Sequence, residues 1–238
     1  MSISFIEGQE PICLPPPDPA AAQLWFERVA QRQAACSIDQ LCTRQAALLG
    51  PQGLLSVFSR QVAAEGRQAP ALRDLLHIED PQRQRLAEQA VDFALARHHR
   101  RAAVDNPYLG LSRQLLCCML FDDQVHYTLA ERFAVSEALR QRDSHYFSTL
   151  IATTRHTVER RLVFTGLLEH FDSLLPIEQS IYPEGYRQAQ QHHLDREEAV
   201  YGKLKLERPV GQLLEAHSAQ WLLEHVCAFN TATVRDSA

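Results

Sequence analysis

Apolar residues recur near helical spacing along most of this chain, and no stretch alternates apolar and polar residues for more than a few positions. The first pattern places apolar side chains on one face of an α-helix, whereas a half-buried β-strand needs strict alternation. Glycine, which is common in the turns of β-proteins, occurs only 9 times in 238 residues. The sequence therefore predicts an all-α fold.

Proline and glycine residues divide this pattern into separate helices. The Asp18-Pro19 and Asp80-Pro81 pairs are typical helix starts, because aspartate accepts from free N–H groups and proline fits the first turn. The pattern predicts helices over residues 20–35, 37–49, 53–64, 71–77, 81–101, 109–140, 144–174, 186–206 and 210–229. These helices are expected to form one helical domain over residues 20–230, packed as a single bundle.

The two ends of the chain are expected to lie outside this domain. Residues 1–19 contain five prolines, which exclude regular hydrogen-bonded structure and predict a flexible proline-rich tail. Such a tail acts as a spacer or docks on an aromatic groove. The polar residues 231–238 predict a frayed C-terminus.

Composition and charge exclude several classes of protein. The net charge of -5 gives no electrostatic reason to expect a nucleic-acid partner. The longest apolar stretches, such as residues 115–121, are far shorter than the roughly 20 residues of a membrane-spanning helix. The first residues lack the basic and apolar regions of a secretory signal. Six cysteines without a CxxC pair favour reduced thiols, so the sequence predicts a cytoplasmic protein.

Common catalytic motifs are absent: the sequence has no GxGxxG, P-loop, GxSxG, HExxH or EF-hand pattern. The residues therefore single out no catalytic side chain. A feature that remains is the number of histidines, eleven, because histidine is the commonest metal ligand.

Carboxylates and histidines recur at intervals of 34 to 36 residues, a distance that allows one helix and a turn. The series runs through Glu88, Asp123 with His126, His156 with Glu159, and His193 with Glu197. Residues three or four apart share a helix face, so antiparallel helices could direct these side chains at one interior point. Carboxylate and imidazole ligands together suit non-haem iron or manganese. The same spacings also occur on solvated helix faces, and both interpretations remain open.

Three stretches resemble ligand-bearing helices of haem-oxygenase-like di-metal oxidases: LFDDQVHYTL (120–129), LIATTRHTVERRLVFTGLLEHF (150–171) and HHLDREEAVYGKL (192–204). Together they cover less than half of the chain. The resemblance implies a haem-oxygenase-like or ferritin-like bundle. It also implies an iron cofactor, mononuclear or dinuclear, that activates dioxygen for oxidation of a small-molecule substrate. The implied ligands are Asp123, His126, Glu159, His193 and Glu197.

Two features of the chain depart from the family pattern. Val200 stands where the family has its last histidine. The carboxylates Asp123 and Glu197 are exchanged relative to the usual glutamate and aspartate. A lost ligand would leave one metal, a substitute such as Tyr201, or none.

The alternative prediction is a non-catalytic helical adaptor or regulator that acts through a protein partner. Residues 97–101, Arg-His-His-Arg-Arg, could hold a phosphate or an acidic partner, or form a solvated helix end. Residues 37–60 have the outline of a helix-turn-helix or of a packed helical hairpin. The last helix could close the core or a homodimer.

Overall fold

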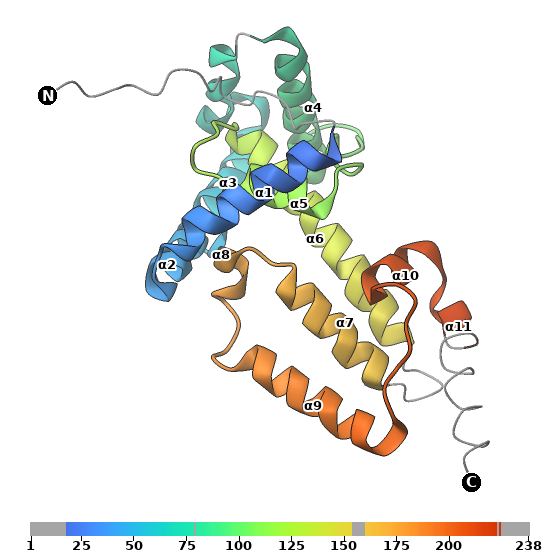
Figure 1. Ribbon diagram of the computed structural model, residues 1–238. Coiled ribbons are helices and arrows are strands. Elements are labelled where there is room, and N and C mark those ends of the chain that lie inside the picture. Colours follow the sequence, from blue (N-terminus) through green and yellow to red (C-terminus); the bar gives the residue numbers. More distant parts are fainter. Residues whose placement is uncertain (1–17, 79, 154–159, 223, 225–238) are drawn as a thin grey trace, which may run out of the picture. The chain divides into compact units, whose positions relative to one another are not determined.

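The computed structural model describes residues 18–78, 80–153, 160–222 and 224 (Figure 1). Every regular element in these ranges is helical, which confirms the predicted all-α fold. The chain divides into two compact units, Met1–Arg140 and Gln141–Ala238, so a single bundle is not confirmed. None of the described helices is both long and apolar enough to cross a bilayer. Most of the predicted tail, residues 1–17, and all of the predicted frayed end lie outside the described residues, while Asp18 and Pro19 begin α1.

Unit 1 begins with helices whose starts the sequence predicts. In α1 (Pro19–Ala34) the Asp18 carboxylate accepts from the Ala20 N–H at 3.1 Å. In α2 (Ile38–Leu49) the Ser37 hydroxyl and the Gln40 side chain form a capping box. A short turn leads into α3 (Leu54–Glu65), which packs against α2. These residues therefore form a packed helical hairpin, the plain alternative to a helix-turn-helix.

The remaining elements of unit 1 follow α3 in the chain. Two 3-10 segments, η1 (Gly66–Gln68) and η2 (Pro70–His77), precede α4 (Pro81–Arg97), and α5 (Arg113–Phe121) packs against α1. The core includes Phe58 and Phe133, whose ring centroids lie 5.4 Å apart. Cys117 and Cys118 of α5 are buried and form no disulfide.

The prediction of one helix over residues 109–140 is wrong. The structure has α5, then a non-helical segment over residues 122–128, and then α6 (Leu129–Ala152). The new helix starts there because two side chains cap its first turn. The Glu131 carboxylate accepts the Thr128 backbone N–H at 2.7 Å, and the Thr128 hydroxyl accepts the Glu131 backbone N–H at 3.2 Å. The break expected near residue 142 is absent, and α6 continues from unit 1 into unit 2.

The described part of unit 2 contains the end of α6 and five further helices: α7 (Arg160–Asp172), α8 (Pro176–Gln179), α9 (Tyr186–Tyr201), α10 (Val210–Ala216) and α11 (Ala219–Leu222). Its core contains Leu150, Leu162, Val210, Leu213, Leu214 and Leu222. Two expected bounds are wrong. Helix α9 ends at Tyr201 because Gly202 takes a φ of 76°, and two short helices replace the single helix expected from residue 210.

A glycine sets the distance between α6 and α7 within unit 2. The Tyr146 hydroxyl donates to the Gly166 carbonyl at 2.8 Å. A Cβ atom at Gly166 would lie 2.9 Å from a terminal methyl of Leu150, closer than side chains pack. The approach of the two helices therefore depends on the missing side chain.

Replacing Gly166 by valine should lower the stability of unit 2 by about 2 kcal/mol, because an overpacked core forces side chains from their preferred rotamers. Urea unfolding followed by circular dichroism measures the loss. The control, Ala189→Val, introduces the same residue at an exposed position of α9 and should cost less than about 1 kcal/mol. Equal losses in the two variants would mean that Gly166 has no special packing role.

Candidate functional site

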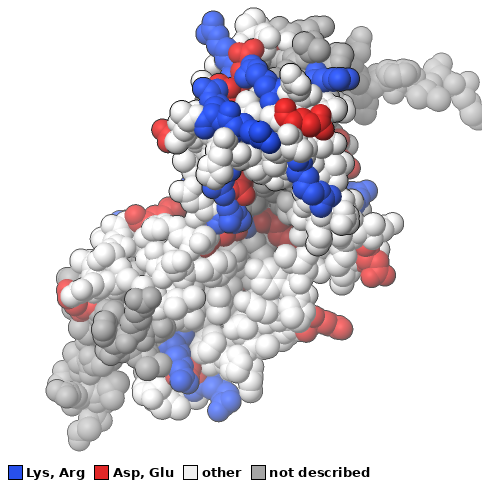
Figure 2. All heavy atoms as spheres, turned by 180° about the vertical axis from the view of Figure 1, so that it is seen from behind, with Lys and Arg blue, Asp and Glu red and all other residues white. Residues whose placement is uncertain are grey.

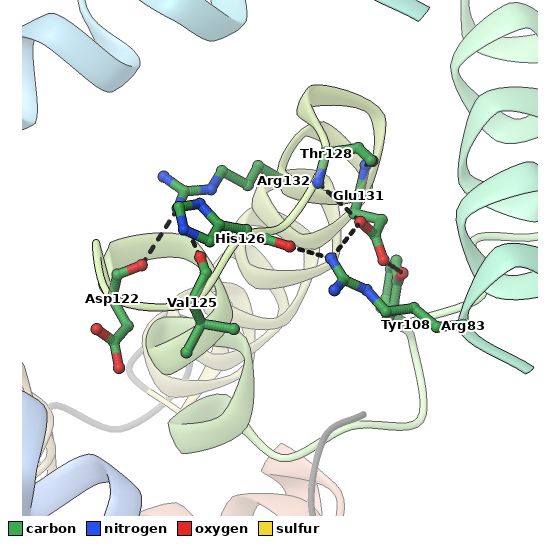
Figure 3. Close-up of polar contacts among 8 residues, drawn as sticks. All are labelled: Arg83, Tyr108, Asp122, Val125, His126, Thr128, Glu131 and Arg132. Carbon is green, nitrogen blue, oxygen red and sulfur yellow. Dashed lines mark hydrogen bonds and ion pairs between the residues drawn. The ribbon is translucent and has the colours of Figure 1, made fainter. Parts of the chain in front are cut away.

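The segment between α5 and α6, residues 122–128, is held by a network of buried and partly buried charged and polar side chains (Figure 3). We call it the α5–α6 loop. The network draws on α1, α4, the turn before α5, the loop itself and the first turn of α6, and all of it belongs to unit 1. Its members are Trp25, Arg32, Arg83, Tyr108, Asp122, Thr128, Glu131 and Arg132.

Glu131 is the acidic centre at one end of the loop. Its side chain is 1% exposed and accepts the Thr128 N–H at 2.7 Å. The Tyr108 hydroxyl and the Arg83 guanidinium both approach its carboxylate, each at 3.4 Å. Burial and the neighbouring carboxylate raise the pKa of Tyr108 well above its usual value. The tyrosine therefore stays protonated and donates to Glu131.

Asp122 is the acidic centre at the other end. It is 3% exposed, and one carboxylate oxygen accepts from the Trp25 indole N–H at 2.7 Å. The other oxygen lies 2.8 Å from the Arg32 guanidinium and accepts the Gln124 N–H at 3.0 Å. Asp122 thus joins α1 to the start of the loop.

Two arginines bind the loop's backbone carbonyls. Arg132 donates to the carbonyls of Asp122 and Val125, both at 3.2 Å, and Arg83 donates to the carbonyl of His126 (Figure 3). The Arg83 guanidinium also lies 5.0 Å from the Tyr127 ring centroid. Burial lowers the pKa of Arg132, and the nearby Asp122 carboxylate opposes that shift. A loop of this length needs such donors, because it lacks the hydrogen bonds of a helix.

The network turns three side chains of the loop toward solvent: Asp123, Gln124 and His126 are exposed. The contacts described above bind backbone or other members of the network. Chemically, the arrangement fixes the shape of a surface loop and presents an acid, an amide and an imidazole on it.

The structure does not place Asp123 and His126 on a helix face, so that prediction is wrong. Both lie on the α5–α6 loop, where spacing by three residues does not align side chains. The Asp123 carboxylate is 71% exposed and 3.7 Å from Arg44. Glu88, the first residue of the predicted series, is exposed on α4.

The remaining predicted ligands belong to unit 2. His193 and Glu197 lie four residues apart on α9, as predicted. The His193 ring is exposed and stacks on Phe164 with centroids 5.2 Å apart, while Glu197 is 3.5 Å from Arg160. Glu159 lies outside the described residues, as does His156.

Among the residues that the structure describes, no three histidine, cysteine, aspartate or glutamate side chains come together to hold a metal. The described members of the predicted ligand set therefore do not form an iron site by themselves. A site completed by Glu159 stays a prediction.

The comparisons with known proteins add no relative. No model of a protein family, no curated protein and no solved structure matches the chain.

The sequence interpretation missed this network, although one part of it has a readable signal. Thr128-Leu-Ala-Glu131 is a capping-box pattern and marks a helix start inside the range expected to be one helix. Asp122 has no such signal, because its partner Trp25 is 97 residues away.

Proposed function

We propose that this protein is a non-catalytic helical adaptor or regulator in the cytoplasm, and that the α5–α6 loop is a contact surface for its protein partner. The observation that carries the proposal is the network of buried charges that fixes the loop, while Asp123, Gln124 and His126 face solvent. The described cysteines Cys36, Cys42, Cys117 and Cys118 form no disulfide, which agrees with a reducing compartment.

The energetics of the network support this role. Buried ion pairs contribute little net stability, since removing two charges from water costs about as much as their attraction returns. Apolar side chains could fill the same space, but they could not bind three backbone carbonyls. The network therefore specifies the conformation of the loop. A loop fixed in advance loses little conformational entropy when a partner binds, which favours recognition.

The alternative is the iron-dependent oxidase implied by the resemblance. It requires the carboxylates and imidazoles to converge inside the protein. Asp123, His126 and His193 are exposed instead, and the Asp123 carboxylate already faces Arg44. The described residues thus favour partner binding, and a small-molecule substrate follows only if iron binds.

Site-specific crosslinking tests the partner surface. A photoreactive amino acid at Gln124, on the loop, should yield one defined covalent adduct in the cells that make the protein. The same amino acid at Gln188, an exposed position of α9, is the matched control and should not yield that adduct. The double variant Asp123→Ala, His126→Ala should weaken the Gln124 adduct. Failure to form an adduct at Gln124, or equal adducts at both positions, would contradict the proposed surface.

Metal content separates the adaptor from the oxidase. The protein is purified without chelator, reconstituted anaerobically with ferrous iron and measured by mass spectrometry beside the His193→Ala, Glu159→Ala double variant. An adaptor should retain far less than one equivalent in both proteins. About one or two equivalents in the parent, lost in the variant, would establish an iron site and overturn the proposal.

A further inference from the structure

Five arginines gather where the ends of α3 and α4 meet the middle of α6 within unit 1. They are Arg67, Arg97, Arg100, Arg101 and Arg140, and we call them the arginine cluster. Figure 2 shows basic side chains gathered on the part of the molecule that contains α4, with acidic side chains between them. The cluster includes the three arginines of the basic run at residues 97–101 that the sequence singles out.

The arginines of the cluster share a small number of carboxylates. Arg67 and Arg101 both pair with Asp92, the first at 3.2 Å. Glu137 likewise pairs with Arg97 at 3.1 Å and with Arg140 at 2.8 Å. A guanidinium carries five N–H donors, so a shared carboxylate leaves donors on each arginine directed at solvent. The side chains of Arg67, Arg97 and Arg140 are 66%, 52% and 68% exposed.

The backbone below the cluster is anchored. The His98 ring lies 3.1 Å from the Ser59 hydroxyl and 5.9 Å, centroid to centroid, from Phe133. His99 turns the chain at the end of α4 with a φ of 56°. Arg100 then donates to the carbonyl of Ala63, where α3 ends. The cluster is therefore held on three packed helices.

The ion-paired groups of the cluster carry a charge opposite in sign to that of the whole chain. Four of the arginines share two carboxylates, Asp92 and Glu137, an excess of two positive charges among the paired groups, whereas the chain carries -5. Glu88, the next acid on α4, lies one helical turn before Asp92 and adds one acidic side chain at the edge of the cluster.

We infer that the arginine cluster binds an acidic segment of a protein partner, a short run of aspartate or glutamate side chains. Guanidinium groups match carboxylates in shape and bind them through paired hydrogen bonds. A short acidic segment fits a local excess of charge, whereas the net negative charge of the chain repels a long nucleic-acid backbone.

The cluster is separate from the α5–α6 loop. Arg83, which binds the loop, and Arg97 lie 14 residues apart on α4, about 20 Å along the helix. The inference rests on the proposed function because both require a protein partner, but it depends on different residues.

The test measures binding of a fluorescein-labelled peptide of ten glutamates to the full chain by fluorescence anisotropy at low and physiological salt. The cluster variant is Arg67→Gln, Arg97→Gln, Arg101→Gln, which leaves Arg100 on its α3 carbonyls. The matched control is Arg28→Gln, Arg85→Gln, Arg196→Gln, three exposed arginines outside the cluster with the same total change of charge. We expect the cluster variant to bind about tenfold more weakly than the parent and the control within about twofold.

A lysine version of the cluster variant keeps the charges and removes the planar donors, and should lose an intermediate amount of affinity. It also keeps the proposal testable if the glutamine variant does not fold. No peptide binding by the parent, equal losses in the cluster and control variants, or tighter binding of a ten-nucleotide single-stranded DNA would overturn the inference. If the Gln124 adduct forms normally while the peptide does not bind, the inference fails and the proposed function stands.

Discussion

Replacement of Glu131 by alanine is expected to lower the free energy of unfolding of unit 1 by about 3–5 kcal/mol. The carboxylate is 1% exposed, and its loss leaves the Arg83 guanidinium, 12% exposed, without its buried counter-charge. The Tyr108 hydroxyl loses its acceptor and the Thr128 N–H loses its cap. An uncompensated buried charge costs more than the net contribution of the intact pair.

Urea unfolding followed by tryptophan fluorescence measures this effect. Of the two tryptophans, Trp25 lies in unit 1, and a Trp221→Phe background removes the signal of unit 2. Glu137→Ala is the control because Glu137 lies on the same helix, is 19% exposed and pairs with exposed arginines; its loss should stay below about 1 kcal/mol. Comparable losses at the two positions would show that the network does not depend on Glu131.

A glutamine at position 131 separates two contributions. Glu131→Gln retains an oxygen that can accept the Thr128 N–H but removes the charge that faces Arg83. Its stability should fall between the parent and Glu131→Ala, because the ionic interaction and the acceptor of the Tyr108 hydroxyl are lost while the cap on Thr128 is kept.

Replacement of Asp122 by alanine is the second large effect, an expected loss of about 2–4 kcal/mol in unit 1. The indole N–H of Trp25, a residue 2% exposed, loses its acceptor at 2.7 Å, and Arg32 loses its pair. The loss should be smaller than at Glu131, because the Arg32 side chain is 36% exposed and can be hydrated.

The same variant links stability to the proposed function. Without Asp122 the first residues of the loop lose their attachment to α1, so the adduct from Gln124 should weaken under conditions in which unit 1 stays folded. Asp123→Ala is the stability control: this side chain is 71% exposed, and its removal should cost less than about 0.5 kcal/mol. An unchanged adduct in a folded Asp122→Ala protein would contradict the role of the network in fixing the loop.

The sequence predicts local features of this protein well. The starts of three helices, at Asp18, Ser37 and Asp80, are confirmed by side-chain caps on backbone N–H groups two or three residues ahead. Such contacts join residues that are close in the sequence, so a sequence pattern can predict them. The same reason explains the correct all-α fold, since helical spacing is also local.

The candidate site is less predictable. The spacing of carboxylates and histidines assumed that Asp123 and His126 share a helix, but the capping box of Thr128 and Glu131 starts a new helix after them. His193, which is exposed, and the half-buried Glu197 do share a helix, and their role as ligands stays a prediction because Glu159 lies outside the described residues.

By itself, therefore, the sequence determined that the chain is helical and where many of its helices begin, because caps and helical periodicity act over two to four residues. Only the tertiary structure decided the form of the α5–α6 loop. Its anchors come from Trp25, 97 residues before Asp122, and from Arg83, 48 residues before Glu131. Burying these charges is favourable only where packed helices bring opposite charges and backbone carbonyls within hydrogen-bond distance. A local sequence pattern does not specify which distant residues come into contact in this way.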